Sequence, residues 1–313
     1  MNKKLAMLGV GVAVGSMMLV TSVYAGVGDA PGYETFKSAV KQTAAVKNVT
    51  RQVNVSVQDN GASLLQVNTT IKNSGEEHAG SAELKVVSGT DVQTIQFYSQ
   101  DGKQIVKTAN SDVYKILQTK ESRAKFKKHD MSEGGANPQI ASEVEHVVDA
   151  LVGNLKNNIT MVDAPGDGKE IHFKLSGSQI PPVVKTVGSL VLKHGAANGK
   201  IQQPAANPAS ALGIDLNTLR NSFPQLASDI SLDEVEVNAN VDGDQHITSQ
   251  MAQIHVSGKD TQGVEHDIVL RVGMTLSSLN ATTPDTIDLN GKQVETVNLE
   301  ELSKQKGWGG KHE

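Results

Sequence analysis

The stretch Gln52-Val-Asn-Val-Ser-Val-Gln-Asp-Asn-Gly61 decides the fold, because it contains a strand and the turn that follows it. Val53, Val55 and Val57 alternate with polar residues, which is the two-residue period of a half-buried β-strand. Asp59-Asn60-Gly61 comes next, and Asn and Gly tolerate the positive φ angles of a tight hairpin turn. The stretch therefore predicts part of an antiparallel sheet.

The same two-residue period continues along the chain. Gly75, Gly89 and Asp101-Gly102 separate its first repeats, and Asp242-Gly243-Asp244 and Gln262-Gly263 separate later ones. Short strands divided by such turns are typical of an antiparallel meander. The further predicted strands span 63–72, 81–88, 92–99, 103–109, 112–118, 169–176, 235–241, 245–258, 264–276 and 293–298.

Helical spacing interrupts the strands. Residues 32–46 place Tyr33, Phe36, Val40 and Ala44 on one stripe, and further helices are expected at 140–155, at 181–194 and from Asp215 onward. All-strand stretches separated by helices predict an α+β protein with an antiparallel sheet rather than a doubly wound parallel sheet. We expect one domain over 26–300, a flexible loop near 195–211 and a mobile tail at 301–313.

The first 25 residues predict a secretory signal peptide. A short cationic start is followed by an apolar run from Leu5 to Val20 and by small residues at Val23 and Ala25, where a signal peptidase cuts. The run is shorter than the roughly 20 residues that span a bilayer, which favours cleavage over a retained membrane anchor. The expected location is extracellular, in the cell wall or in the periplasm, with no stable transmembrane span after cleavage.

Charge and motifs exclude several classes of function. Removing residues 1–25 deletes two lysines and no acid, which leaves 27 basic against 34 acidic residues and a net charge of −7. Such a chain repels nucleic acids.

It has no cysteine, no HExxH pair, no Gly-x-Ser-x-Gly elbow and no Walker loop, so we expect no enzyme, no catalytic residues and no cofactor. One metal site stays open in principle: Asp244, His246 and the run Glu265-His266-Asp267, if their strands pair.

The element order resembles that of the LolA/LolB-like lipoprotein-carrier superfamily, which includes the mycobacterial LppX and LprG type. The matching pieces are the opening helix with Tyr33-Glu-Thr-Phe36, the strand–turn–strand 53–71, the segment 95–106 with its Asp101-Gly-Lys103 turn, and Asp112-Val-Tyr-Lys115. The resemblance implies a curved, unclosed antiparallel half-barrel, with an N-terminal helix and two or three central helices on its concave face. The family has no catalytic signature, and without a lipobox cysteine this chain is not anchored as LppX or LolB is.

A half-barrel of this kind encloses an interior lined by alternate strand residues, which here are mainly Val, Ile and Leu. Such a lining suits a lipid or acyl chain. The expected function is therefore an exported, non-enzymatic binding protein for an apolar ligand. The alternative is a filled core, in a cell-envelope module that binds a protein partner or senses stress. The expected lining residues are Tyr33, Phe36, Val40, Val53, Val55, Val57, Phe97, Val144, Val148 and Leu151.

Overall fold

One curved sheet dominates the protein. A computed structural model describes residues 31–75, 79–118, 158–181 and 224–298, and the following statements concern these residues. The elements in chain order are α2 (Pro31–Ala45), β1 (Val49–Asp59), β2 (Ala62–Ser74), β3 (Ala79–Ser88), β4 (Asp91–Gln100), β5 (Lys103–Thr108), β6 (Val113–Gln118), β7 (Ile159–Ala164), β8 (Gly168–Ser176), the short 3-10 helix η3 (Gly177–Gln179), β9 (Ser228–Val241), β10 (Ile247–Lys259), β11 (Glu265–Ser277) and β12 (Gln293–Asn298).

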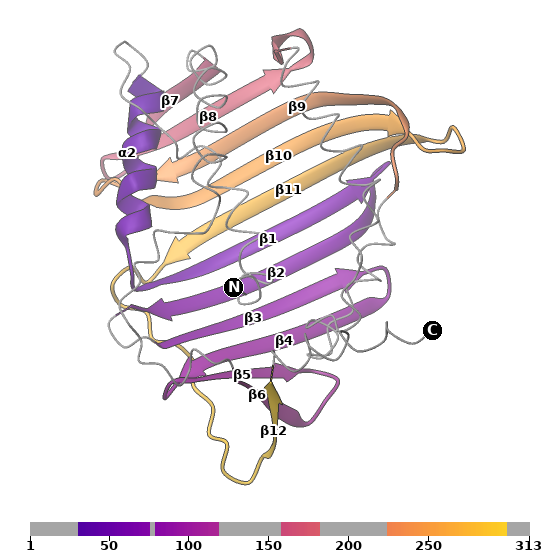
Figure 1. The fold of residues 1–313 in the computed structure, drawn as a ribbon. Coiled ribbons are helices and arrows are strands. Elements are labelled where there is room, and N and C mark those ends of the chain that lie inside the picture. The colour runs from indigo at the N-terminus through magenta and orange to yellow at the C-terminus, as the bar shows by residue number, and fades with distance from the viewer. Residues whose placement is uncertain (1–30, 76–78, 119–157, 182–223, 299–313) are drawn as a thin grey trace, which may run out of the picture.

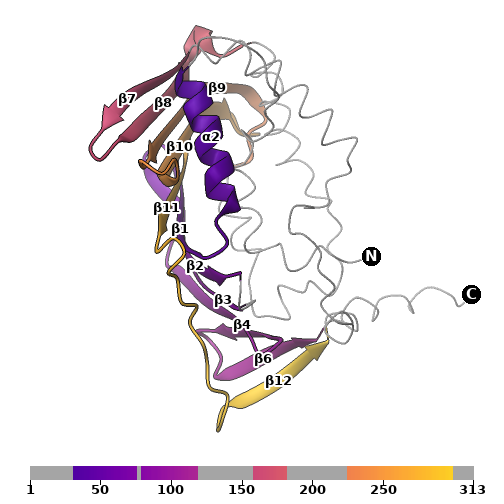
Figure 2. The same cartoon turned by 90° about the vertical axis from the view of Figure 1, so that its left-hand side faces the viewer.

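The twelve strands form a single sheet in the order β12-β6-β5-β4-β3-β2-β1-β11-β10-β9-β8-β7. Neighbouring strands are antiparallel except β12 and β6, which are parallel. β7 and β12 lie at opposite edges, so the described sheet does not close into a barrel (Figure 1). Seen from the side, the sheet bends around α2, which lies on its concave side near β7–β10 (Figure 2).

Helix α2 forms because its sequence carries a helical start and one buried stripe. Pro31 suits the first helical position, and Glu34 in the first turn complements the helix dipole. Phe36, Ala39 and Thr43 are buried at spacings of three and four residues. Phe36 and Ala39 pack in one cluster with residues of β8, β9 and β10, namely Ile171, Ala239, Val241 and Ile247.

The β1–β2 hairpin has the turn that the sequence predicts. Asn60 and Gly61 have φ angles of 49° and 80°, and Asp59 pairs directly with Ala62. Positive φ at both central residues is the type I′ arrangement, whose twist matches that of the flanking strands. The Asn60 side chain also accepts a hydrogen bond from the backbone of Asp267, which ties this turn to β11.

The segment between β11 and β12 crosses the convex side of the sheet (Figure 2). Thr282 bonds to Thr50 of β1, and Asp285 forms an ion pair with Lys72 of β2 at 2.7 Å. The backbone of Ile287 exchanges two hydrogen bonds of 2.8 Å with the Gln100 side chain of β4. These contacts carry the chain from the middle of the sheet to its edge, where β12 pairs with β6.

Most predicted strands are confirmed within a few residues, and the differences have physical causes. β9 begins at Ser228, seven residues before the predicted start at 235, because a register shift near Asp233 breaks the two-residue period. β7 was not predicted: it is a short edge strand with two partly buried apolar residues on its inner side, Ile159 and Met161. The parallel pairing of β12 is also a correction to the predicted meander.

Several sequence predictions fall outside the described residues. They are the signal peptide 1–25, the helices at 140–155, 181–194 and after Asp215, the loop near 195–211 and the tail 301–313. In the described part of the chain, the fold is mostly an unclosed antiparallel sheet with one α-helix. No helix in this part is long and apolar enough to cross a membrane.

Candidate functional site

The strand register sorts side chains onto two faces of different chemistry. Val53 of β1 lies opposite Thr69 of β2 and Met274 of β11. From Met274 the register continues through Gln250 and Ala239 to Ile171 of β8, and residues directly opposite one another share a face. Val53 is therefore on the same side of the sheet as Ile171, which packs against α2. This side is the concave face. It is apolar over most of its width: it carries Ile171, Phe173, Leu175, Val235, Val237, Ile254, Val256, Leu270, Val272, Val53, Val55, Val57, Leu65, Val67, Leu84, Val86, Ile95 and Phe97.

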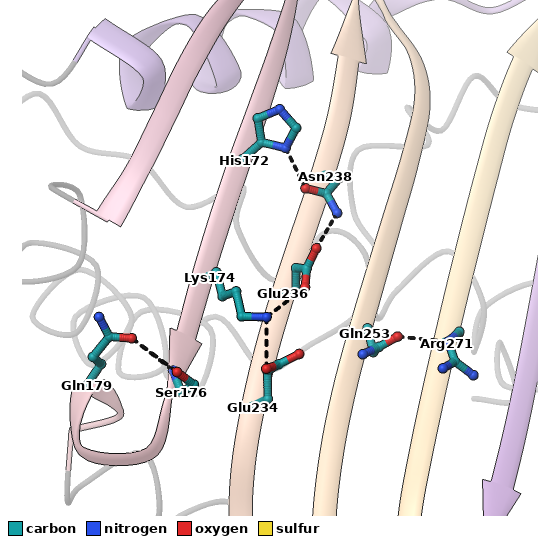
Figure 3. A network of polar contacts seen from close by, with 9 residues as sticks. All are labelled: His172, Lys174, Ser176, Gln179, Glu234, Glu236, Asn238, Gln253 and Arg271. Atoms are coloured by element: carbon teal, nitrogen blue, oxygen red, sulfur yellow. Dashed lines mark hydrogen bonds and ion pairs between the residues drawn. The ribbon is translucent and has the colours of Figure 1, made fainter. Parts of the chain in front are cut away.

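The opposite, convex face is polar. Lys174 of β8 lies 2.9 Å from Glu234 and 3.4 Å from Glu236 of β9, and Asn238 bonds to both Glu236 and His172 (Figure 3). The hydrogen bond to Glu234 raises the pKa of Lys174, and the hydrogen bond from Asn238 lowers the pKa of Glu236. These groups satisfy one another in contact with solvent, so the convex face is polar over β8 and β9.

Two of the three predicted lining residues from α2, Phe36 and Val40, belong to a packed cluster. Phe36 is only 5% exposed, and Val40 packs at the edge of the same cluster as Ile171 and Ala239. Tyr33, also on α2, is partly buried. Gly32 lets the helix start close to β7, since a Cβ there would lie 3.1 Å from the carbonyl oxygen of Ile159. Under α2 the concave face is therefore filled core.

The predicted lining residues from the strands share the concave face but differ in burial. Val53 and Val57 are almost fully buried, and Val57 packs with Leu65 and Val86. Val55 and Phe97 are partly buried on the same face. The remaining three predicted lining residues, Val144, Val148 and Leu151, lie outside the described residues. The structure thus places the four predicted strand residues on one face of the sheet and the three predicted α2 residues on the helix that lies over that face.

Some of the partly buried apolar side chains of the concave face form a band across its middle, and three of them, Val67, Ile254 and Leu270, also pack against the buried clusters. Its members come from six strands, β9, β10, β11, β1, β2 and β4: Val237, Ile254, Leu270, Val55, Val67 and Phe97. We call these residues the apolar band. Aliphatic and aromatic side chains that retain accessible area are what an apolar ligand contacts.

The polar side chains of the concave face include two long ones near the middle of the sheet, Arg51 and Gln250, which the sequence-based prediction did not include. Arg51 of β1 lies between the neighbouring strand residues Ile71 and Leu276. Gln250 of β10 is 7% exposed and lies next to Met274. Arg51 could have been found, because it precedes Val53, Val55 and Val57 at the same two-residue spacing.

A third polar group lies at the far end of β1. The Asp59 carboxylate accepts a hydrogen bond of 2.7 Å from Nδ1 of His266 on β11. The side chains of Asp59 and His266 are 14% and 12% exposed. His266 also lies 3.6 Å from a carboxylate oxygen of Asp260. The hydrogen bond to Asp59 raises the pKa of His266, against the opposing effect of burial. The second oxygen of Asp59 and Nε2 of His266 are buried without a hydrogen bond.

The metal site left open by the sequence does not assemble in the described residues. His246 lies before β10 and His266 at the start of β11, so the whole length of β10 separates them. His266 faces the concave side, whereas its neighbours Glu265 and Asp267 face the convex side. Within the part of the chain that the structure describes, no three His, Asp or Glu side chains come together as metal ligands.

Comparison with known proteins assigns neither a family nor a function to this chain. No protein-family model matches the sequence, and no curated protein matches it. Among solved structures, an S-type phycobiliprotein lyase, CPES, from Guillardia theta is similar with a TM-score of 0.19 and 6% identity, over 82% of this chain and 99% of that chain.

A beta-barrel-like protein of a domain of unknown function, DUF1849, from Brucella abortus is similar with a TM-score of 0.16 and 9% identity, over 74% of this chain and 100% of that chain. Similarities this low carry no argument about family or activity. The resemblance to LolA/LolB-like carriers has no support from sequence comparison.

Proposed function

We propose that this chain is an exported, non-enzymatic binding protein that holds an apolar ligand against its concave face. The observation that carries the proposal is the separation of the two faces, mainly apolar on the concave side and mainly polar on the convex side, together with the partly accessible apolar band. A sheet whose inner face only completed a core would leave little of these side chains accessible. The apolar run from Leu5 to Val20 and the small residues before Gly26 support the export part of the proposal.

The non-enzymatic part of the proposal has support from the surroundings of the polar groups. A His–Asp pair acts as a general base only when a nucleophile or a substrate proton lies within hydrogen-bond reach of its free nitrogen. Nε2 of His266 has no hydroxyl or amine partner in the described residues, where it lies 3.6 Å from the Asp260 carboxylate and forms no hydrogen bond. The pair is better explained as part of the rim of the concave face.

The first experiment is native mass spectrometry of residues 26–313, purified from the secreting host without detergent. We expect added masses that solvent extraction releases as lipid or another apolar molecule. An apo mass that stays unshifted after fatty acids and phospholipids are added would overturn the proposal. It would favour the alternative function, an envelope module that binds a protein. N-terminal sequencing of the secreted chain tests export separately, with Gly26 as the expected first residue.

A pair of variants assigns the bound mass to one face of the sheet. Val55→Asp places a charge in the apolar band, and Asn54→Asp places the same charge on the convex face one residue earlier. Burying a carboxylate against a hydrocarbon chain costs more free energy than the contact returns. We therefore expect Val55→Asp to lose the bound mass and Asn54→Asp to keep it. Equal loss in both variants, or in neither, would contradict binding at the concave face.

A further inference from the structure

Arg51 is a cation set into an apolar surface. On its own strand, Val49 and Val53 precede and follow it on the same face, with exposed fractions of 0% and 1%. On the neighbouring strands its register partners are Ile71 and Leu276, each 5% exposed. Four buried aliphatic side chains therefore surround the position from which the guanidinium extends.

Arg51 has no counter-charge in the described part of the chain. None of the hydrogen bonds or ion pairs among these residues involves its side chain, and burial lowers its pKa without an opposing carboxylate. The nearest acid on the same face of β1 is Asp59, eight residues away, or about 26 Å along a strand, and Asp59 is bonded to His266. An unpaired cation in such surroundings destabilises the fold unless something else binds it.

Arg271 shows the contrast within the same sheet. It lies on the convex face, where its Nε donates to Gln253 at 2.8 Å (Figure 3). One of its terminal nitrogens donates to Gln58 at 2.7 Å. On the polar face neighbouring side chains thus satisfy the guanidinium of Arg271, whereas on the apolar face Arg51 has no such partner among the residues that the structure describes.

Gln250 provides a second unpartnered polar group near Arg51. Its side chain is more than nine-tenths buried, and it forms no hydrogen bond with any other described side chain. The register runs from Val53 through Met274 to Gln250, so Gln250 lies two strands from β1, about 10 Å across the sheet. Both long side chains can therefore reach a group lying over Met274 and Leu276.

We propose that the apolar ligand carries an anionic oxygen head, a carboxylate or a phosphate, that Arg51 and the amide of Gln250 bind. This inference rests on the proposed function and adds the chemistry of the ligand's head to it. The planar guanidinium donates two parallel hydrogen bonds to such an oxyanion, and the Gln250 amide donates a third. The hydrocarbon chain then contacts the apolar band, beginning at Val55 two strand positions beyond Val53.

The test compares three probes with the same sixteen-carbon chain: hexadecanoate, hexadecyl phosphate and hexadecanol. Each is titrated below its micelle concentration into the wild-type chain 26–313 at neutral pH, and affinity is measured by calorimetry. We expect at least one anion to bind about tenfold or more tightly than the alcohol. A preference for the carboxylate indicates a free fatty acid as ligand, and a preference for the phosphate indicates a phospholipid head.

Variants assign the preference to Arg51. We expect Arg51→Met to remove the preference for the anion while hexadecanol binding stays unchanged, and Arg51→Lys to retain part of it. Gln250→Leu should reduce the preference by a smaller factor. Arg271→Met is the matched control, because it removes the same charge from the convex face and should leave all three affinities unchanged.

The outcomes separate the two proposals. If the wild-type chain binds all three probes equally, the anionic head is wrong while the proposed binding function stands. If it binds none of them, the proposed function fails, and the inference that rests on it fails too. An Arg51→Met variant that does not fold leaves the wild-type comparison of anion and alcohol, and the Arg51→Lys variant, as decisive measurements.

Discussion

At the scale of single residues, the two ends of β1 carry opposite charges on an otherwise apolar face. Arg51 lies at one end, and Asp59 with His266 lies at the other. Val53, Val55 and Val57 lie between them. Charged groups on a buried face cost free energy unless they are paired, and the two ends meet this condition differently. Asp59 has His266 as a partner within the chain, whereas Arg51 has none among the described residues.

The Asp59–His266 pair predicts a pH-dependent stability. Because Asp59 raises the pKa of folded His266, the pair stabilises the fold fully below the ordinary histidine pKa of about 6.5. That stability is lost as the pH rises through the raised pKa. We therefore expect Asp59→Asn to lower the free energy of unfolding more at pH 6 than at pH 9, measured by urea denaturation across this range.

A second carboxylate–histidine pair serves as the control. Asp267 bonds to His255 on the convex face, where the Asp267 side chain is 55% exposed and solvent weakens the interaction. Asp267→Asn should change the free energy of unfolding by less than Asp59→Asn at pH 6. An Asp59→Asn effect that is constant from pH 6 to pH 9 would show that Asp59 does not raise the pKa of His266.

At the scale of elements, α2 is held to the sheet by one buried hydroxyl as well as by its apolar stripe. Thr43 donates to the carbonyl oxygen of Ala39 at 2.6 Å and accepts from the backbone N–H of Ile247 at 2.8 Å. Ile247 is the first residue of β10, so this contact sets where the C-terminal end of α2 meets the strand. Without the hydroxyl, a buried N–H would lack a partner.

Thr43→Val should therefore destabilise the protein despite its nearly equal volume. We expect a loss of about 1–3 kcal/mol in the free energy of unfolding, the usual consequence of leaving a buried donor unsatisfied. Thr43→Ser is the control, because it keeps the hydroxyl and removes a methyl group, for a loss of about 0.8 kcal/mol. Denaturant titration that found Thr43→Val no less stable than Thr43→Ser would contradict this role of the hydroxyl.

Element positions were largely predictable because they depend on local periodicity. Valines at every second residue predict β1, and Asn60-Gly61 predicts the hairpin, since positive φ is a property of those two residues. The start of β9 was not predictable in the same way. An extra residue near Asp233 shifts the register, and only pairing with β10 shows that the strand continues.

At the scale of the whole molecule, residues 278–292 cross the convex face of the sheet (Figure 2). This segment therefore does not cover the concave face, where we propose that the ligand binds. A ligand bound on the concave face would contact residues from strands far apart in the sequence, such as Val55 and Ile254. Those contacts exist only in the folded sheet. Ligand binding must therefore favour the folded state over the unfolded chain.

This linkage gives a prediction for the whole chain. A ligand at about one hundred times its dissociation constant should raise the free energy of unfolding by about 2.7 kcal/mol. We expect urea denaturation of the wild-type chain with the tightest of the sixteen-carbon probes to show this increase. Val55→Asp should show none at the same probe concentration, whereas Asn54→Asp should match the wild type. Equal stabilisation of both variants would place the ligand elsewhere than on the apolar band.

The candidate site was only partly predictable from the sequence. Val53, Val55, Val57 and Phe97 share a face, as the sequence analysis required, because side chains alternate along any strand. The sequence did not separate the fully buried side chains, Val53 and Val57, from the partly buried ones, Val55 and Phe97, since burial depends on which other segments lie opposite. Arg51 and Gln250 come from segments 199 positions apart, and no local pattern connects them.

The sequence by itself determined the strands, the hairpin turns and the amphipathic helix α2, because each follows from the spacing and conformational preferences of neighbouring residues. The tertiary structure alone decided that β1 pairs with β11, that β12 runs parallel to β6, and that Asp59 meets His266. These are contacts between distant segments, and many strand orders would satisfy the same alternating pattern. Burial of one continuous apolar face selects among them, and it is also what leaves Arg51 on that face without a partner in the described chain.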